Sequence, residues 1–198
     1  MPVSPEGHAR SGALVLVVGP SGAGKDTIMR RVHDRLSPGS GIVFARRVVT
    51  RAADAAEDNE VATDETFLEA LGRGGFVLDW QAHGLRYGVP RQVCEELAQG
   101  RVVVVNVSRT VVARARSTFT CVRIVLLTAP AEIRASRISA RGRDADAAER
   151  LAREPLPLDE LRPDLTIDNA GTPEAAVDRL QRFLIDLIGR TRPVGERH

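Results

Sequence analysis

The chain has 198 residues, enough for one domain with a substantial core, and its formal net charge is only +2, so a broad nucleic-acid surface is not indicated. No apolar stretch approaches the roughly 18 residues of a membrane span, and residues 1–10 lack the apolar segment of a signal peptide. Cys94 and Cys121 are too few for a disulfide framework. These features predict a cytoplasmic protein that binds neither membrane nor nucleic acid.

Apolar runs alternate with segments of helical periodicity along the chain. The predicted strands are residues 13–18, 42–49, 76–81, 85–88, 102–107, 121–127 and 165–168. The predicted helices are residues 27–36, 64–73, 90–99, 110–116, 131–141 and 173–188. Residues 52–63 are polar and predict a loop, and residues 142–163 are charged and then Pro-rich, which predicts a mobile lid. This alternation favours an α/β fold with a mainly parallel sheet covered by helices on both faces.

The paired strands predicted within residues 76–88 interrupt this rhythm and indicate a small inserted subdomain. We therefore predict a single domain over residues 12–190. Its predicted parts are a core at 12–50 and 100–190, a subdomain at about 51–90 and a lid at about 141–163. The tails, residues 1–11 and 191–198, are rich in Pro, Gly and charge, and we expect them to be disordered.

The loop between the first predicted strand and the first predicted helix has the sequence GPSGAGKD, residues 19–26. A Gly-rich loop in this context is typical of a phosphate-binding loop, because glycines let successive backbone N–H groups point at phosphate oxygens, beside the N-terminus of the helix. Lys25 is the only lysine in the chain and supplies a mobile positive charge for a transferred phosphoryl group. The candidate nucleotide-binding residues here are Gly19, Pro20, Ser21, Gly22, Ala23, Gly24, Lys25, Asp26 and Thr27.

The residue after the lysine departs from the usual motif, which has Ser or Thr at this position to bind Mg²⁺. Here the residue is Asp26, and Thr27 follows it. A carboxylate is a natural oxygen ligand for Mg²⁺, but aspartate also stabilises the start of a helix. Asp26 is therefore the candidate metal ligand, with Thr27 as the alternative ligand and a purely helix-stabilising role for Asp26 as the other interpretation.

Five motifs together resemble the guanylate kinase-like family, and the resemblance covers about residues 13–188. The motifs are GPSGAGKD at 19–26, VTR at 49–51, LRYGVP at 85–90, RISARGR at 137–143 and DNAG at 168–171. The resemblance implies a P-loop kinase core with a parallel sheet, a small acceptor-binding subdomain and an Arg-rich lid. It also implies ATP as the phosphoryl donor and Mg²⁺ as the cofactor.

The positions that read the acceptor depart from guanylate kinases, which bind guanine with carboxylates. The aspartate pair after the third parallel strand is replaced by Asn106-Val107-Ser108, and Arg109 follows. Within the family the chain is most similar to the ribose 1,5-bisphosphate phosphokinases of phosphonate degradation, which share the Lys-Asp loop ending and a WQAHGLRYGV-like stretch, here at 80–89. That resemblance implies transfer of the ATP γ-phosphate to the 1-phosphate of ribose 1,5-bisphosphate, giving 5-phosphoribosyl 1-diphosphate.

The resemblance also assigns roles to single residues on the acceptor and nucleotide sides. Arg51 and Tyr87 match an arginine and a tyrosine that hold the acceptor phosphate, and we predict that Arg109 holds the distal 5-phosphate. The second phosphate-binding arginine of guanylate kinases falls near Asp54 and is missing. Asn169 follows the last predicted strand, at the end where α/β sheets bind ligands, and is a candidate for contact with adenine.

The arginines before and within the predicted lid are the candidates for charge neutralisation during phosphoryl transfer. Arg134, Arg137 and Arg141 recur at i, i+3 and i+7, which places them on one helix face. We predict Lys25, Arg137, Arg141 and Arg150 as the catalytic residues, and a surface position for Arg134. Elsewhere we expect Arg46 and Arg86 to be solvated, Trp80 to pack in the core and His83 to lie in a turn.

Two other functions stay open at the level of sequence. One is a guanylate or other nucleoside monophosphate kinase, against which the altered base-reading positions argue. The other is a non-catalytic guanylate kinase-like interaction module, against which the intact Lys25 loop and the arginines of the lid argue. ATP binding tests the module directly, because such a module is expected to bind none. The predicted partner is a small phosphorylated sugar.

Overall fold

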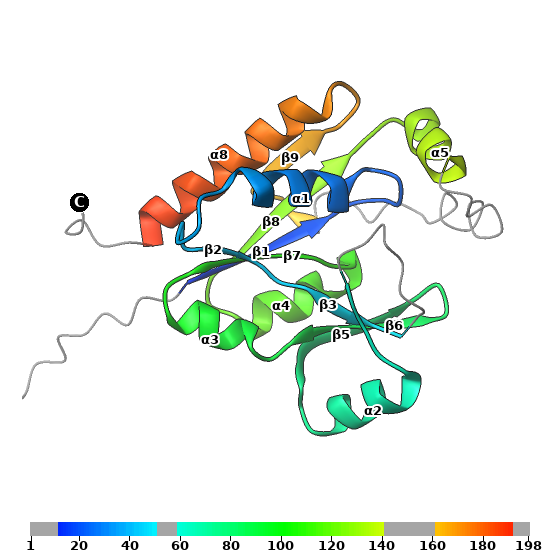
Figure 1. Cartoon of the computed structure of the whole chain (residues 1–198), viewed down its shortest axis with the longest axis vertical. Helices are drawn as coiled ribbons and strands as arrows, with labels where there is room; N and C mark the ends of the chain where they lie inside the picture. The colour runs from blue at the N-terminus through cyan, green and yellow to red at the C-terminus, as the bar shows by residue number, and fades with distance from the viewer. Residues whose placement is uncertain (1–11, 51–58, 141–160, 192–198) are drawn as a thin grey trace, which may run out of the picture.

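Two β-sheets organise the residues that the structure, a computed structural model, describes: 12–50, 59–140 and 161–191 (Figure 1). The core sheet has five parallel strands in the order β2-β7-β1-β8-β9. They are β1 (Ala13–Val18), β2 (Ile42–Phe44), β7 (Val102–Asn106), β8 (Val122–Thr128) and β9 (Leu165–Asp168). The middle strand, β1, is buried along its whole length because helices cover both faces of the sheet, which explains its uninterrupted apolar sequence.

Helices pack on both sides of the core sheet and confirm the predicted α/β fold (Figure 1). One face carries α1 (Lys25–Arg35) and α8 (Pro173–Thr191), and the other carries α3 (Val93–Ala98) and α4 (Val112–Thr118). Two more helical elements follow strand ends: the 3₁₀ helix η1 (Arg109–Val111) after β7 and α5 (Ala131–Ser139) after β8. Among the described residues, no helix combines the length and hydrophobicity needed to cross a membrane.

A second, smaller sheet lies beside the core sheet and has four strands in the order β4-β3-β6-β5. They are β3 (Arg47–Val49), β4 (Asn59–Val61), β5 (Phe76–Ala82) and β6 (Leu85–Pro90). Helix α2 (Asp64–Gly72) connects β4 to β5, and the hydroxyl of Thr63 caps its N-terminus. The predicted hairpin is confirmed: β5 and β6 pair antiparallel, and His83 lies in the turn with a positive φ of 54°.

The sequence predicted one strand over residues 42–49, and this is wrong, because the stretch forms two strands in different sheets. β2 pairs with β7 of the core, and the Ala45 amide still donates to Val104 O (2.9 Å). From Arg47 onward the chain pairs instead with β6 and β4. The β-branched residues at both ends of the stretch suit either sheet, and the change of partner falls at the interruption Ala45-Arg46-Arg47 between them.

Three further differences from the predictions concern element boundaries. Strand β4 lies inside the predicted loop 52–63, since its sequence NEV has no apolar alternation and it forms by pairing with β3. The helix predicted from Pro90 begins at Val93, because Pro90 is the last residue of β6 and lies opposite Phe76. The first helix also begins earlier than predicted, at Lys25, directly after Gly24.

Candidate functional site

The phosphate-binding loop connects the carboxyl end of β1 to the N-terminus of α1, as the motif requires. Its three glycines, Gly19, Gly22 and Gly24, are fixed by close neighbours as well as by backbone conformation. A Cβ on Gly19 would lie 2.0 Å from the carbonyl oxygen of Leu127, and one on Gly24, whose φ is 92°, would lie 2.6 Å from Nδ2 of Asn169. The loop is therefore packed against the ends of β8 and β9, which hold its shape.

Lys25 folds back over the loop that precedes it. Its Nζ donates hydrogen bonds to the carbonyl oxygens of Gly19 (2.8 Å) and Pro20 (3.1 Å) and is partly buried. These contacts place the ammonium group at the mouth of the loop, on the path that phosphate oxygens would take. The positive charge predicted for phosphoryl transfer is thus at the loop and not extended into solvent.

Asp26 lies against the end of β7. Its Oδ1 accepts a hydrogen bond from Nδ2 of Asn106 (2.7 Å), and Nη2 of Arg47 lies 3.6 Å from the same oxygen. Asn106 is buried, whereas the Asp26 side chain is 30% exposed. One carboxylate oxygen is therefore directed into the protein, and the group keeps enough access to take a metal ligand role; Thr27 follows it in the first turn of α1.

Arg137 and Asn169 form the other wall of the loop. Asn169 donates from Nδ2 to Ala23 O (2.9 Å), and Arg137 donates from Nη2 to Asn169 O (3.1 Å). Nη1 of Arg137 and Oδ1 of Asn169 are buried and have no hydrogen-bond partner among the described residues. Buried polar groups are rarely left unsatisfied, so this donor and this acceptor fit a polar ligand beside Gly24.

Tyr87 belongs to the second sheet and forms part of an aromatic stack. Its ring lies parallel to that of Trp80, with centroids 5.3 Å apart and an interplanar angle of 4°, and both residues are only 8% exposed. The predicted core packing of Trp80 is confirmed. The guanidinium of Arg47 also lies over the Tyr87 ring, with its Cζ 5.7 Å from the ring centroid.

Arg47 is a residue that the sequence analysis missed. It is 9% exposed and contacts both the end of the phosphate-binding loop and the second sheet. Strand alternation could have found it, because Arg47 and Val49 share one face of β3 and Val49 is buried. The predicted acceptor-phosphate residue Arg51 lies outside the described residues, as do Arg141, Arg150 and most of the predicted lid.

Arg109 is the first residue of η1, which packs against β5 of the second sheet. The hydroxyl of Ser108 caps this short helix by accepting from Thr110 N (3.3 Å). Ser108 and Arg109 thus follow the end of β7 at the junction of the two sheets. This position agrees with a role on the acceptor side, which stays a prediction.

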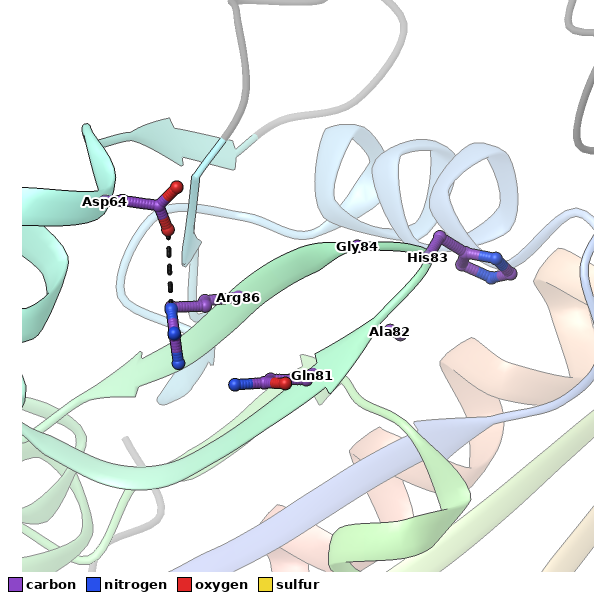
Figure 2. Close-up of a pocket in the computed structure, with 6 residues that line it drawn as sticks. All are labelled: Asp64, Gln81, Ala82, His83, Gly84 and Arg86. Carbon is purple, nitrogen blue, oxygen red and sulfur yellow. Dashed lines mark ion pairs between the residues drawn. The ribbon is translucent and has the colours of Figure 1, made fainter.

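A polar, open pocket of about 360 Å³ lies at the turn of the β5–β6 hairpin (Figure 2). It is lined by Asp64, Gln81, Ala82, His83, Gly84 and Arg86. Figure 2 shows Arg86 facing Asp64, with which it forms an ion pair at 3.4 Å. Strand alternation places Arg86 on the opposite sheet face from Tyr87, so this pocket is separate from the predicted phosphate contacts.

Comparison with known proteins identifies the family. No family model matches the chain. Ribose 1,5-bisphosphate phosphokinase PhnN of Rhodopseudomonas palustris is 47% identical over 184 residues, which cover 92% of this chain and 91% of that protein. The PhnN protein of Methylobacterium radiotolerans is 50% identical over 175 residues, covering 87% and 97% of the two chains.

Among solved structures, the guanylate kinase of Anaplasma phagocytophilum matches with a TM-score of 0.66 at 19% identity, over 93% of this chain and 88% of that one. This similarity confirms the guanylate kinase-like P-loop fold. The sequence relationships reach further, because they extend over most of both chains at high identity. The chain belongs to the family of ribose 1,5-bisphosphate phosphokinases PhnN.

Proposed function

We propose that this protein transfers the γ-phosphoryl group of ATP to the 1-phosphate of ribose 1,5-bisphosphate and forms 5-phosphoribosyl 1-diphosphate and ADP. An anionic oxygen of the 1-phosphate attacks the γ-phosphorus, and the bond from that phosphorus to the β–γ bridging oxygen breaks, so that ADP leaves. The attacking oxygen already carries negative charge. Catalysis therefore needs positioning and charge neutralisation, and no strong general base.

The observation that carries the phosphoryl-transfer step is the buried Nη1 of Arg137, which has no hydrogen-bond partner among the described residues and lies beside Gly24. A guanidinium in this position suits a phosphate oxygen, which accepts strong charge-assisted hydrogen bonds. Lys25 adds the second described cation at the loop. The buried Oδ1 of Asn169 would accept from a ligand donor, which an adenine amino group can provide.

Mg²⁺ would be held through Asp26 and the phosphates of ATP, where it would neutralise charge on the β- and γ-oxygens. The described residues contain no cluster of three or more His, Cys, Asp or Glu side chains suited to a metal. One carboxylate agrees with this use, since protein sites for Mg²⁺ commonly supply one or two carboxylates and leave the other positions to water and phosphate.

The acceptor side favours a sugar bisphosphate over a guanine nucleotide. The Asn106 side chain is buried, and its amide nitrogen donates to Asp26, which ties this residue to the phosphate-binding loop. Guanine would then lack carboxylate acceptors for N1 and N2, at about 1–3 kcal/mol for each unsatisfied group. Ribose 1,5-bisphosphate has no base to read, and its second phosphate calls for a cation such as Arg109.

The test is a coupled ADP-release assay with ribose 1,5-bisphosphate, GMP, AMP and UMP as acceptors. We expect the highest kcat/KM with ribose 1,5-bisphosphate. GMP turnover as fast as bisphosphate turnover would overturn the assignment. Absence of both ATP binding and turnover would instead favour an interaction module.

The metal role proposed for Asp26 predicts a change in the dependence on Mg²⁺. We expect Asp26→Ala to raise the Mg²⁺ concentration for half-maximal activity by about 10- to 100-fold, because a ligand charge is lost. Asp26→Asn is the matched control, since its side-chain oxygen can still accept from Asn106. If Asp26→Asn keeps the Mg²⁺ dependence of the wild type, Asp26 serves only the loop and the start of the helix.

The role proposed for Arg109 predicts a selective loss of acceptor binding. We expect Arg109→Ala to raise KM for ribose 1,5-bisphosphate by about 10- to 100-fold, because a charge-assisted hydrogen bond to the distal phosphate is lost, and to leave KM for ATP nearly unchanged. Arg73 is an exposed residue at the C-terminal end of α2, and Arg73→Ala is the control. Equal increases in both KM values would remove Arg109 from the acceptor site.

A further inference from the structure

Arg47 carries a buried positive charge at the point where the two sheets meet. Its side chain is only 10% exposed, and burying a charge is costly unless other groups compensate for it. Nε donates to Oδ1 of Asn59 (3.2 Å), Nη2 lies 3.6 Å from Oδ1 of Asp26, and the guanidinium faces the ring of Tyr87. These groups come from β4, α1 and β6, so three separate elements converge on one side chain.

The position of Arg47 lies between the donor and acceptor groups of the proposed reaction. Asp26 belongs to the nucleotide side, and Tyr87 is the predicted contact of the acceptor phosphate. In-line transfer brings the attacking oxygen close to the γ-phosphorus, so the acceptor phosphate must enter the space between these two sides. Among the described residues, Arg47 is a cation that contacts both Asp26 and Tyr87.

Resting on the proposed function, we propose that Arg47 is a second phosphate-binding arginine of the acceptor site, which positions the attacking oxygen of the 1-phosphate. The bond from Nε to Asn59 fixes the plane of the guanidinium and directs Nη2 toward the Asp26 side. The separation of 3.6 Å from Asp26 is an ion-pair distance beyond ordinary hydrogen bonding, so a phosphate oxygen can engage Nη2 without displacing a short bond to that carboxylate.

The charge balance supports the same role. Asp26 partly neutralises Arg47 as the two residues stand in the structure. A metal ion on Asp26 would offset the negative charge of that carboxylate, which favours a doubly charged phosphate over a neutral hydroxyl acceptor beside it. Arg47 would thereby replace the second phosphate-binding arginine that falls near Asp54 and is missing from the sequence.

The test compares Arg47→Gln with Arg46→Gln. Arg46 is the neighbouring exposed arginine, and it donates from Nη2 to the backbone carbonyl oxygen of the same Asn59, which makes it a matched control. Titration calorimetry with ribose 1,5-bisphosphate and with ATP measures both affinities, steady-state assays measure both KM values, and thermal unfolding checks the fold.

For Arg47→Gln we expect Kd and KM for ribose 1,5-bisphosphate to rise by about 10- to 100-fold, with the values for ATP within about twofold of the wild type. Arg46→Gln is expected to change neither substrate. Arg47→Lys keeps the charge but loses the planar fork, so an intermediate loss is expected, and this variant decides the question if Arg47→Gln does not fold. Equal losses for both substrates, or wild-type bisphosphate affinity in the folded variant, would overturn the proposal.

Failure of the proposed function has a different signature. A wild-type protein that phosphorylates GMP and not ribose 1,5-bisphosphate would reject the proposed substrate. The role of Arg47 would then require the same selective rise in KM for GMP, because both acceptors present a phosphate to be attacked. An Arg47 variant with unchanged KM for whichever acceptor the wild type uses rejects the role of Arg47 alone.

Discussion

Replacement of Lys25 by alanine is expected to lower kcat by about 10³-fold or more and to leave the fold intact. The ammonium group lies at the mouth of the phosphate-binding loop, where it contacts the carbonyl oxygens of Gly19 and Pro20. During transfer, negative charge shifts toward the leaving ADP, and a loop without its lysine no longer neutralises that charge. The measurement is ADP release at saturating substrates, with thermal unfolding as the check on the fold.

Lys25→Arg is the matched control for this prediction. The variant keeps the positive charge but replaces a compact ammonium with a planar guanidinium. Lys25 is the only lysine of the chain, whose other Lys/Arg residues are all arginines. We expect most of the activity to be lost in this variant as well, because the loop geometry suits a point charge. A folded Lys25→Ala protein with near-normal turnover would end the interpretation of residues 19–26 as a catalytic phosphate-binding loop.

The second large effect is expected at Arg137. Arg137→Ala should lower kcat by about 10²- to 10³-fold, because the variant lacks the buried guanidinium nitrogen that we place on a phosphate oxygen in the transition state. Its other terminal nitrogen donates to Asn169 O, so the side chain is held in position before the ligand binds. Single-turnover measurements separate this loss from slower release of product.

Arg134 provides a control on the same helix. It lies one turn earlier on α5, and its Nε donates to Ala129 O (3.2 Å) within the start of that helix. We expect Arg134→Ala to reduce kcat by less than about threefold, since local contacts of this kind contribute little. Equal losses at Arg134 and Arg137 would indicate a general effect on the helix and would contradict the proposed contact between Arg137 and phosphate.

Much of the core was predictable because its physical signals are local. Parallel strands covered on both faces are mainly apolar, and β1 is apolar throughout, whereas β7 and β8 are apolar except for Asn106 in β7 and for Arg123 and Thr128 in β8. The phosphate-binding loop was predictable for a similar reason: its glycines, its lysine and its place between a strand and a helix are all contiguous in sequence.

The contacts that join distant segments were not predictable from pattern alone. The hydrogen bond from Asn106 to Asp26 spans 80 positions, and that from Asn169 to Ala23 spans 146. Arg47 was missed because residues 42–49 were interpreted as one strand, although β2 and β3 belong to different sheets. Each of these contacts depends on which strands are neighbours in a sheet. The composition of a single strand does not determine that order.

The close approach of Gly24 to Asn169 has a consequence for how sequences in this family can diverge. A Cβ at position 24 would meet the Asn169 amide at 2.6 Å, and the backbone there has a positive φ. Alanine at position 24 is therefore disfavoured twice, by this contact and by the backbone conformation. A smaller residue at position 169 would relieve only the contact and would remove the hydrogen bond to Ala23, so glycine is expected at position 24 whatever residue stands at 169.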